Sequence, residues 1–169
     1  MRRPFASGPE IPELEFRRAE LRANHLDDVG GALDLLEGVV KTAPNHEGAR
    51  RLLEKLIAVP DYRQRVAKVL EPIYEQSGAW ARLVANLEVQ REALEGRAAS
   101  ALLARCAEIQ EQRLQARAVA LGTWRQVLAA DPDNAGALAH VERLATAQRS
   151  SPSWSMSTRS WRSRRTPPI

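Results

Sequence analysis

The sequence predicts an all-α chain in which antiparallel helical hairpins stack side by side as an α-solenoid. Two observations support this fold class. Apolar residues recur at helical spacing through most of the chain. In addition, residues 15–56 align onto residues 103–144 without a gap and share twelve identities in 42 positions, where roughly three or four would arise by chance. Such self-similarity is typical of a solenoid, because each unit buries its apolar face only against its neighbours.

The repeat has a period of 88 residues, set by Pro44 and Pro132. Most identities are small or apolar residues, as expected where helices pack closely. Like-for-like exchanges such as Leu21/Ile109 extend the match. The identical pairs are Arg17/Arg105, Ala19/Ala107, Glu20/Glu108, Leu26/Leu114, Ala32/Ala120, Leu33/Leu121, Val39/Val127, Pro44/Pro132, Gly48/Gly136, Ala49/Ala137, Glu54/Glu142 and Leu56/Leu144.

A two-helix unit is clearest between residues 119 and 144. Helical spacing places one apolar stripe on each of its helices. Residues 131–134, Asp-Pro-Asp-Asn, break the first helix and offer capping side chains to the second. The predicted stripes are Ala120, Trp124, Val127 and Leu128 on the first helix, and Leu138, Val141, Leu144 and Ala145 on the second.

Six further helices are predicted before this unit, and short links between them predict antiparallel neighbours. Pro72 lies inside the fourth helix and predicts a kink, because it removes a backbone hydrogen bond. The predicted helices span residues 12–24, 27–42, 45–58, 62–76, 79–94 and 97–114. Their predicted inward residues, helix by helix, are Leu14, Arg18, Leu21 and His25; Ala32, Leu36, Val39 and Val40; Leu52, Leu53 and Leu56; Val66, Val69, Leu70 and Ile73; Trp80, Leu83, Val84 and Leu87; and Leu102, Leu103, Cys106 and Ile109.

The basic charge of the chain belongs to its C-terminal end. Residues 148–169 hold five arginines and no acid, so the formal net charge of +4 leaves residues 1–147 at −1. We therefore expect a disordered lead-in over residues 1–11, a helical body over residues 12–147 and a basic Ser/Arg/Pro-rich tail over residues 148–169. Two interpretations of the tail stay open: a disordered basic extension, or an out-of-frame reading that replaces a further helix.

Nothing in the sequence indicates a membrane span, a secretory signal or a catalytic, cofactor or metal site. No stretch of about 18 apolar residues is uninterrupted, and the N-terminal residues lack an apolar signal core, so we expect a cytoplasmic protein. Cys106 lies on an apolar stripe, which favours a packing role over a nucleophile. His25, His46 and His140 are isolated from one another and from any metal-binding motif.

The spacing of tryptophan, alanine and proline follows a known pattern, W-x₂-L-G-x₂-Y…A-x₃-F…P. Its second half is met by Ala120-x₃-Trp124 with Pro132 and by Ala32-x₃-Leu36 with Pro44, and its first half is approximated by Trp80-x₂-Leu83-Val84-x₂-Leu87. On these residues the chain resembles the tetratricopeptide repeat (TPR) family over roughly residues 13–147. It departs from the pattern at Val84, where the family has glycine, and at Leu87, where it has tyrosine. The 88-residue unit also holds about five helices rather than four.

The resemblance is to the degenerate, alanine- and leucine-rich repeats of long bacterial repeat proteins. It implies a TPR-like superhelix that binds another protein or peptide and catalyses no reaction. In this family the first helix of each hairpin lines a concave groove, where polar side chains clamp a peptide. On the fifth and sixth predicted helices, the candidates for such a groove are Arg82, Asn86, Gln90, Arg105, Glu108 and Gln112.

Two other functions remain as alternatives. In the first, the arginine-rich tail binds nucleic acid, with Trp154 and Trp161 stacking on bases. In the second, the chain is only a piece of a longer repeat array and has no autonomous function, since neither end of the repeat carries a polar capping helix. The leading prediction is a non-enzymatic scaffold for protein–protein interaction.

Overall fold

The computed structural model describes residues 10–150, and these residues form eight α-helices and a short 3₁₀ turn, without a strand in that range. The all-α prediction is confirmed for this part of the chain. The N-terminal residues 1–9 of the predicted lead-in and residues 151–169 of the predicted tail lie outside the described residues. The elements are α1 (Glu10–His25), α2 (Val29–Thr42), α3 (Glu47–Leu56), η1 (Pro60–Tyr62), α4 (Arg63–Gln76), α5 (Trp80–Arg91), α6 (Gly96–Gln112), α7 (Arg117–Ala130) and α8 (Ala135–Ser150).

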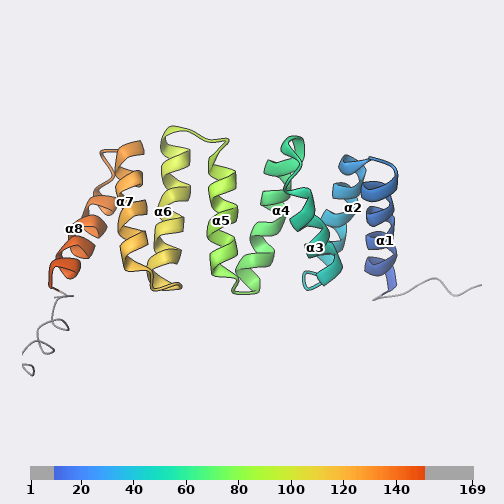
Figure 1. Ribbon diagram of the computed structural model, residues 1–169, viewed down its shortest axis with the longest axis horizontal. Coiled ribbons are helices and arrows are strands. Elements are labelled where there is room, and N and C mark those ends of the chain that lie inside the picture. The colour runs from blue at the N-terminus through green and yellow to red at the C-terminus, as the bar shows by residue number, and fades with distance from the viewer. Residues whose placement is uncertain (1–9, 151–169) are drawn as a thin grey trace, which may run out of the picture.

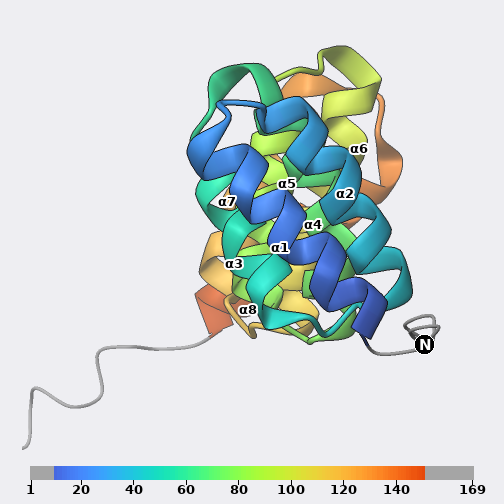
Figure 2. The same cartoon turned by 90° about the vertical axis from the view of Figure 1, so that its right-hand side faces the viewer.

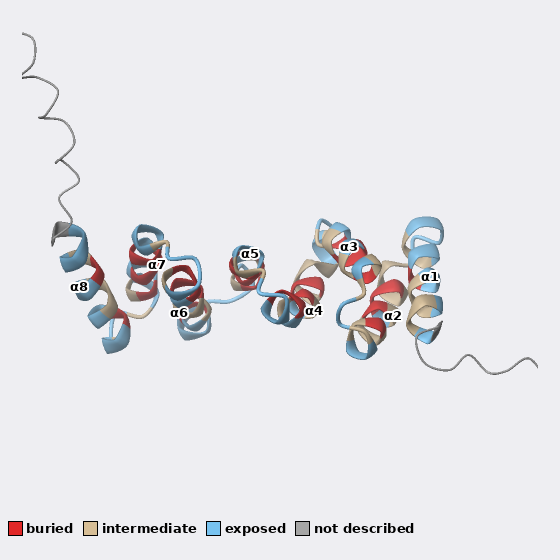
Figure 3. Cartoon of the chain, turned by 90° about the horizontal axis from the view of Figure 1, so that it is seen from below, coloured by how far each residue is buried: buried red, intermediate tan, exposed pale blue. Residues whose placement is uncertain are grey.

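Consecutive helices lie side by side along one axis, each running against the direction of the one before it (Figure 1). Seen from below, α3, α5 and α7 lie toward one side of this row and α2, α4 and α6 toward the other, while α1 and α8 extend across it (Figure 3). Helices two places apart also meet, since α1 contacts α3 and α2 contacts α4. The molecule is therefore built from two offset rows of helices.

Capping side chains begin three of the helices. The Asp28 carboxylate accepts a hydrogen bond of 2.8 Å from the Gly31 amide, and Asn134 accepts one of 3.0 Å from the Ala137 amide. Such bonds satisfy amides that have no partner inside the helix. The cap at Asn134 was predicted from the sequence, and Asp28 lies at the predicted start of the second helix. A third cap was not predicted, because histidine is an uncommon residue there: His46 Nδ1 accepts from an amide of α3 at 3.1 Å.

The 88-residue repeat is also a repeat of structure. Residue for residue, α2 and α7 have the same bounds once the offset is applied, and α3 and α8 begin at equivalent positions. Asp27 and Gln115, 88 residues apart, both adopt a φ of 53° in the link that follows the first helix of each copy. Four identical pairs are fully buried: Ala19/Ala107, Ala32/Ala120, Val39/Val127 and Ala49/Ala137. The module α1–α2–α3 thus recurs as α6–α7–α8.

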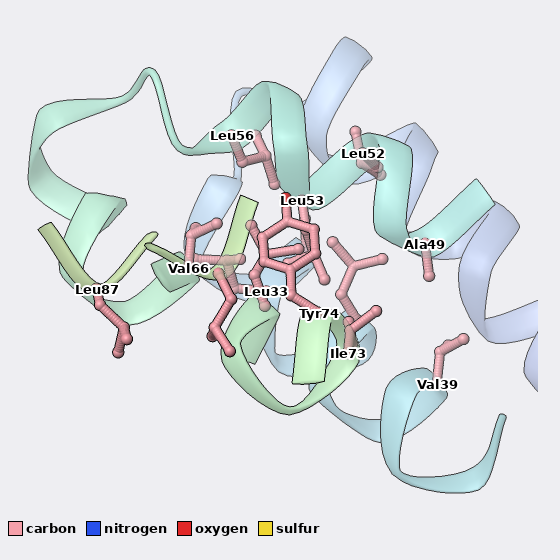
Figure 4. Packing of buried hydrophobic residues seen from close by; sticks show 14 of the residues in the cluster. Leu33, Val39, Ala49, Leu52, Leu53, Leu56, Val66, Ile73, Tyr74 and Leu87 are labelled. Atoms are coloured by element: carbon pink, nitrogen blue, oxygen red, sulfur yellow. The ribbon is translucent and has the colours of Figure 1, made fainter. Parts of the chain in front are cut away.

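The apolar core consists of two clusters that meet at α6. The larger cluster joins α1 to α5 and gathers around Leu33, Leu53 and Tyr74 (Figure 4). Cys106 and Ile109 of α6 belong to it, whereas Ala107, on another face of α6, belongs to the smaller cluster with α7 and α8. Because α6 buries two faces, it couples the two halves of the row.

The sequence prediction of the inward stripe of the first helix is wrong. Leu14 and Leu21 expose 52% and 55% of their surface, and Arg18 and His25 are exposed as well. The buried face instead holds Ala19, with Phe16 half-buried beside it. The helix carries two apolar stripes, and helical spacing alone does not show which one packs against α2 and α3.

Leu138 is a second error of the same kind. It is 49% exposed, while the neighbouring Ala137 is fully buried against α7. All other residues predicted to face inward are buried or half-buried. Helix α4 continues without interruption through Pro72, whose side chain is exposed.

Candidate functional site

Asn86 and Gln90 were predicted to line an accessible groove, and that placement is wrong. Asn86 is 3% exposed and its Nδ2 donates a 2.8 Å hydrogen bond to the Ala67 carbonyl of α4. Gln90 is 8% exposed and its Nε2 donates to Glu71 Oε2 at 2.7 Å. Helix α5 packs on α4 on one side and on α6 on the other. Asn86 and Gln90 therefore form hydrogen bonds between α5 and α4 inside the molecule.

The two predicted arginines also bind within the chain. Arg82 Nη1 donates to Glu54 Oε1 at 2.8 Å, which links α5 to α3. Arg105 donates to both Glu71 and Glu75 and links α6 to α4. Burial by itself would lower the pKa of Arg105, but the hydrogen bond and charge of Glu71 raise it. The last two candidates, Glu108 and Gln112, are exposed on α6.

The structure thus brings together two of the six candidates, Gln90 and Arg105, on the carboxylate of Glu71. Glu71 accepts from Gln90 through one oxygen and from Arg105 through the other. Three helices, α4, α5 and α6, meet at this carboxylate. The sequence prediction missed Glu71 because nothing in its own helix marks it; its partners come from 19 and 34 residues further along the chain.

Ion pairs connect α2, α4, α6 and α8, and in each of them the arginine is on the later helix and the acid on the earlier one. In each step an arginine reaches back to acids two helices earlier, as Arg105 does. The other pairs are Arg65 with Asp34 and Glu37 at 2.6 and 2.7 Å, and Arg143 with Glu111 at 2.6 Å. Exposed ion pairs contribute little to stability, and these link helices two places apart in the chain.

One recess on this side of the molecule has the character of a binding groove. It lies between α2 and α4 and has a volume of about 310 Å³. Val40, Val69 and Pro72 make its surface largely apolar. Its full lining is Glu37, Val40, Lys41, Arg65, Lys68, Val69 and Pro72. We call it the α2–α4 groove.

The three basic side chains around the α2–α4 groove differ in whether they are paired with acids. Arg65 is held by Glu37 and Asp34, whereas Lys41 and Lys68 are exposed and form no ion pair with any described residue. Pro72 has no amide hydrogen, so the Lys68 carbonyl lacks its helical donor. The groove therefore offers an apolar surface beside two free ammonium groups, which suits an apolar side chain flanked by acids.

None of the six sequence candidates lines this groove. The signal that would have pointed to it is the combination of Pro72 with Val40 and Val69, which were predicted to face inward and are only half-buried. The pairing of α2 with α4, however, is between helices that are not neighbours in sequence. Only the tertiary structure places these residues together.

The remaining chemically interesting side chains have structural roles. Cys106 is buried, and burial together with the nearby Glu88 raises the pKa of its thiol to about 11, which disfavours the nucleophilic thiolate. Trp124 is 3% exposed and stacks on His140 with ring centroids 4.2 Å apart. Among the described residues, no group of histidine, cysteine, aspartate or glutamate side chains is arranged to hold a metal ion, and no helix has the length and apolar character of a membrane span.

Comparison with models of protein families, with curated proteins and with solved structures finds no match to this chain.

Proposed function

We propose that this chain is a non-enzymatic scaffold that binds a segment of another protein in the α2–α4 groove. The observation that supports this proposal is the contrast between the free Lys41 and Lys68 and the paired Arg65 beside them. Arg65 and Arg105, by contrast, each pair with two acids two helices earlier, and Arg143 pairs with one. A partner with an apolar residue between acids would fill the groove and neutralise both lysines.

We further propose that the two offset rows of helices form an α-solenoid of the TPR type. The packing of each helix on its neighbours and the recurrence of the α1–α2–α3 module support the solenoid. The motif residues around Trp80 and Trp124 support the TPR resemblance. As a working hypothesis we place the scaffold in the bacterial cytoplasm, where the repeat proteins that it resembles occur.

The test is affinity capture from the source cell with three versions of the full chain, followed by mass spectrometry. We expect the unmodified chain to retain a partner that the groove variant Lys68→Glu/Val69→Asp releases. Lys55→Glu, on the exposed side of α3 and outside the groove lining, lowers the net charge by two units, against three for the groove variant, and should retain that partner. Equal retention by the groove variant and Lys55→Glu would reject the groove as the binding site.

Removal of residues 151–169 separates the scaffold from the nucleic-acid alternative. The cut lies after the last residue of α8, so it leaves every described helix whole. The scaffold proposal predicts that protein capture persists without the tail. Loss of a salt-sensitive RNA or DNA complex on truncation, with no protein partner in either version, would favour the alternative.

A further inference from the structure

Helix α1 carries an apolar stripe that no described part of the chain covers. Ile11, Leu14 and Leu21 expose 45%, 52% and 55% of their surface, and Arg18 and His25 lie between and beyond them on the same face. The view along the row looks onto α1 with no other described helix in front of it (Figure 2). We call these five residues the α1 stripe.

The repeat identifies the counterpart of this stripe inside the molecule. An offset of 88 residues maps the five positions onto Ala99, Leu102, Cys106, Ile109 and Arg113 of α6. In α6 the apolar members of this set are covered: Ala99, Cys106 and Ile109 are all less than 10% exposed, and Leu102 is half-buried. The same face of the same module is thus buried in one copy and exposed in the other.

Helix α5 covers that face in the second copy. Cys106 and Ile109 belong to one cluster with Leu83, Val84 and Leu87 of α5. At the end of the interface the Arg113 guanidinium lies 4.9 Å from the centre of the Trp80 ring. An established helix–helix interface therefore shows which kind of surface fits the α1 stripe.

We propose that the α1 stripe docks an amphipathic helix of a partner protein, in the manner in which α5 docks on α6. The partner helix presents valine and leucine residues at helical spacing, an aromatic residue near its N-terminal end and an acid beside the apolar stripe. This inference rests on the proposed scaffold function but uses a different face of the molecule from the α2–α4 groove.

Arg18 favours a partner helix that carries an acidic residue beside its apolar stripe. It occupies the position of Cys106 and forms no ion pair with a described residue. In the α5–α6 interface, the charge of Glu88 raises the pKa of Cys106 and the charges of Arg105 and Arg91 lower it, so α5 brings both an acid and an arginine near this position. A partner helix with an acid at the place of Glu88 therefore brings a carboxylate to Arg18.

The same arginine disfavours a second copy of this chain as the occupant. In a two-fold antiparallel pair of α1 helices, the residue at the centre of the stripe lies against itself. That residue is Arg18, with Leu14 on one side and Leu21 on the other. Two guanidinium groups would then meet in the middle of the apolar contact, which is unfavourable.

The probe is a fluorescent peptide of residues 78–95, which contains α5. Isolated helices of this length are marginal in water, so the peptide carries a covalent staple in place of Ala81 and Ala85, which are both exposed on α5. We expect fluorescence anisotropy to show saturable binding to the full chain. Leu14→Glu/Leu21→Glu should weaken binding at least tenfold. Leu138→Glu, which alters an exposed leucine of α8, should leave it unchanged.

A charge exchange tests the predicted register. Arg18→Glu should weaken binding of the peptide by about fivefold, and Glu88→Lys in the peptide should restore binding to Arg18→Glu. All of these substitutions are on the surface, and circular dichroism is expected to be unchanged. The groove variant Lys68→Glu/Val69→Asp should still bind the peptide, so failure of the groove proposal and failure of this one are distinguishable.

Three results would overturn the inference. The first is the absence of saturable peptide binding. The second is binding that Leu14→Glu/Leu21→Glu does not weaken, which would mean that the peptide replaces α5 on α6 or binds elsewhere. The third is a dimer in light scattering that Leu21→Glu dissociates, which would make a second copy the occupant.

Discussion

Single residues show how the two copies of the module diverge by compensating exchanges. A Cβ atom on Gly48 would lie 2.7 Å from Cζ of Phe16, closer than packed carbon atoms allow. At the equivalent Gly136 the nearest neighbour would be Asn134 Oδ1, at 3.4 Å. The difference follows from the sequence, because Ala104 stands where the first copy has Phe16. The aromatic ring in α1 therefore requires the glycine in α3.

We predict that Gly48→Ala lowers the free energy of unfolding by about 1–2 kcal/mol, because the new methyl group displaces the Phe16 ring. Gly136→Ala should leave stability unchanged or raise it by up to about 1 kcal/mol, since alanine favours the helix. Urea denaturation of both variants measures the difference. Gly48→Ala should cost less unfolding free energy in a Phe16→Ala background, where His46 Cε1 at 3.2 Å is the remaining close neighbour of the new Cβ. Equal effects of the two glycine substitutions would contradict the proposed contact with the ring.

At the scale of elements, α4, α5 and α6 are joined by one carboxylate. Glu71 accepts from the buried Gln90 amide and from the partly buried Arg105. Glu75 binds the same arginine at 3.2 Å, but its side chain is 54% exposed. The two acids share a helix, a charge and a partner, yet differ in burial.

We predict that Glu71→Ala costs about 2 kcal/mol of unfolding free energy, because it leaves the Gln90 amide buried without an acceptor. Glu75→Ala should cost less than about 1 kcal/mol, since an exposed ion pair is screened by water. Thermal and urea unfolding compare the two. If both substitutions lowered the free energy of unfolding by the same amount, Glu71 would not be the carboxylate that joins these three helices.

At the scale of the whole molecule, stability is divided between two apolar clusters. The smaller one holds α7 and α8 against one face of α6, and the larger one holds α1 to α5. In such a row a local loss of packing affects mainly the adjoining helices. Val39 and Val127 are equivalent and fully buried residues of the two clusters, so they form a matched pair for this question.

We predict that Val127→Ala, at a cost of about 2 kcal/mol, increases amide hydrogen exchange in α7 and α8 and leaves α2 to α4 protected. Val39→Ala should have the opposite pattern, with faster exchange in α1 to α3. Hydrogen exchange followed by mass spectrometry resolves the helices. A uniform increase along the chain in either variant would mean that the molecule unfolds as one unit.

Much of the local structure could be predicted because it depends on neighbouring residues. Asp28 and Asn134 cap helices through amides three residues away, and Gly78 ends α4 with a φ of 66°. The candidate site could not be predicted in this way. Asn86 and Gln90 look like surface residues in sequence, and only the position of α4 shows that they are buried.

The sequence by itself determined the helices, most of their buried faces and the 88-residue repeat, because periodicity and capping act within a few turns of one chain. Only the tertiary structure decided which of two apolar stripes on α1 is covered, and that the α2–α4 groove opens between helices that are not consecutive. An 88-residue unit with an odd number of helices, placed in two offset rows, puts equivalent helices such as α2 and α7 on opposite sides (Figure 3). The same module therefore meets different neighbours, and the neighbours decide which surface stays free.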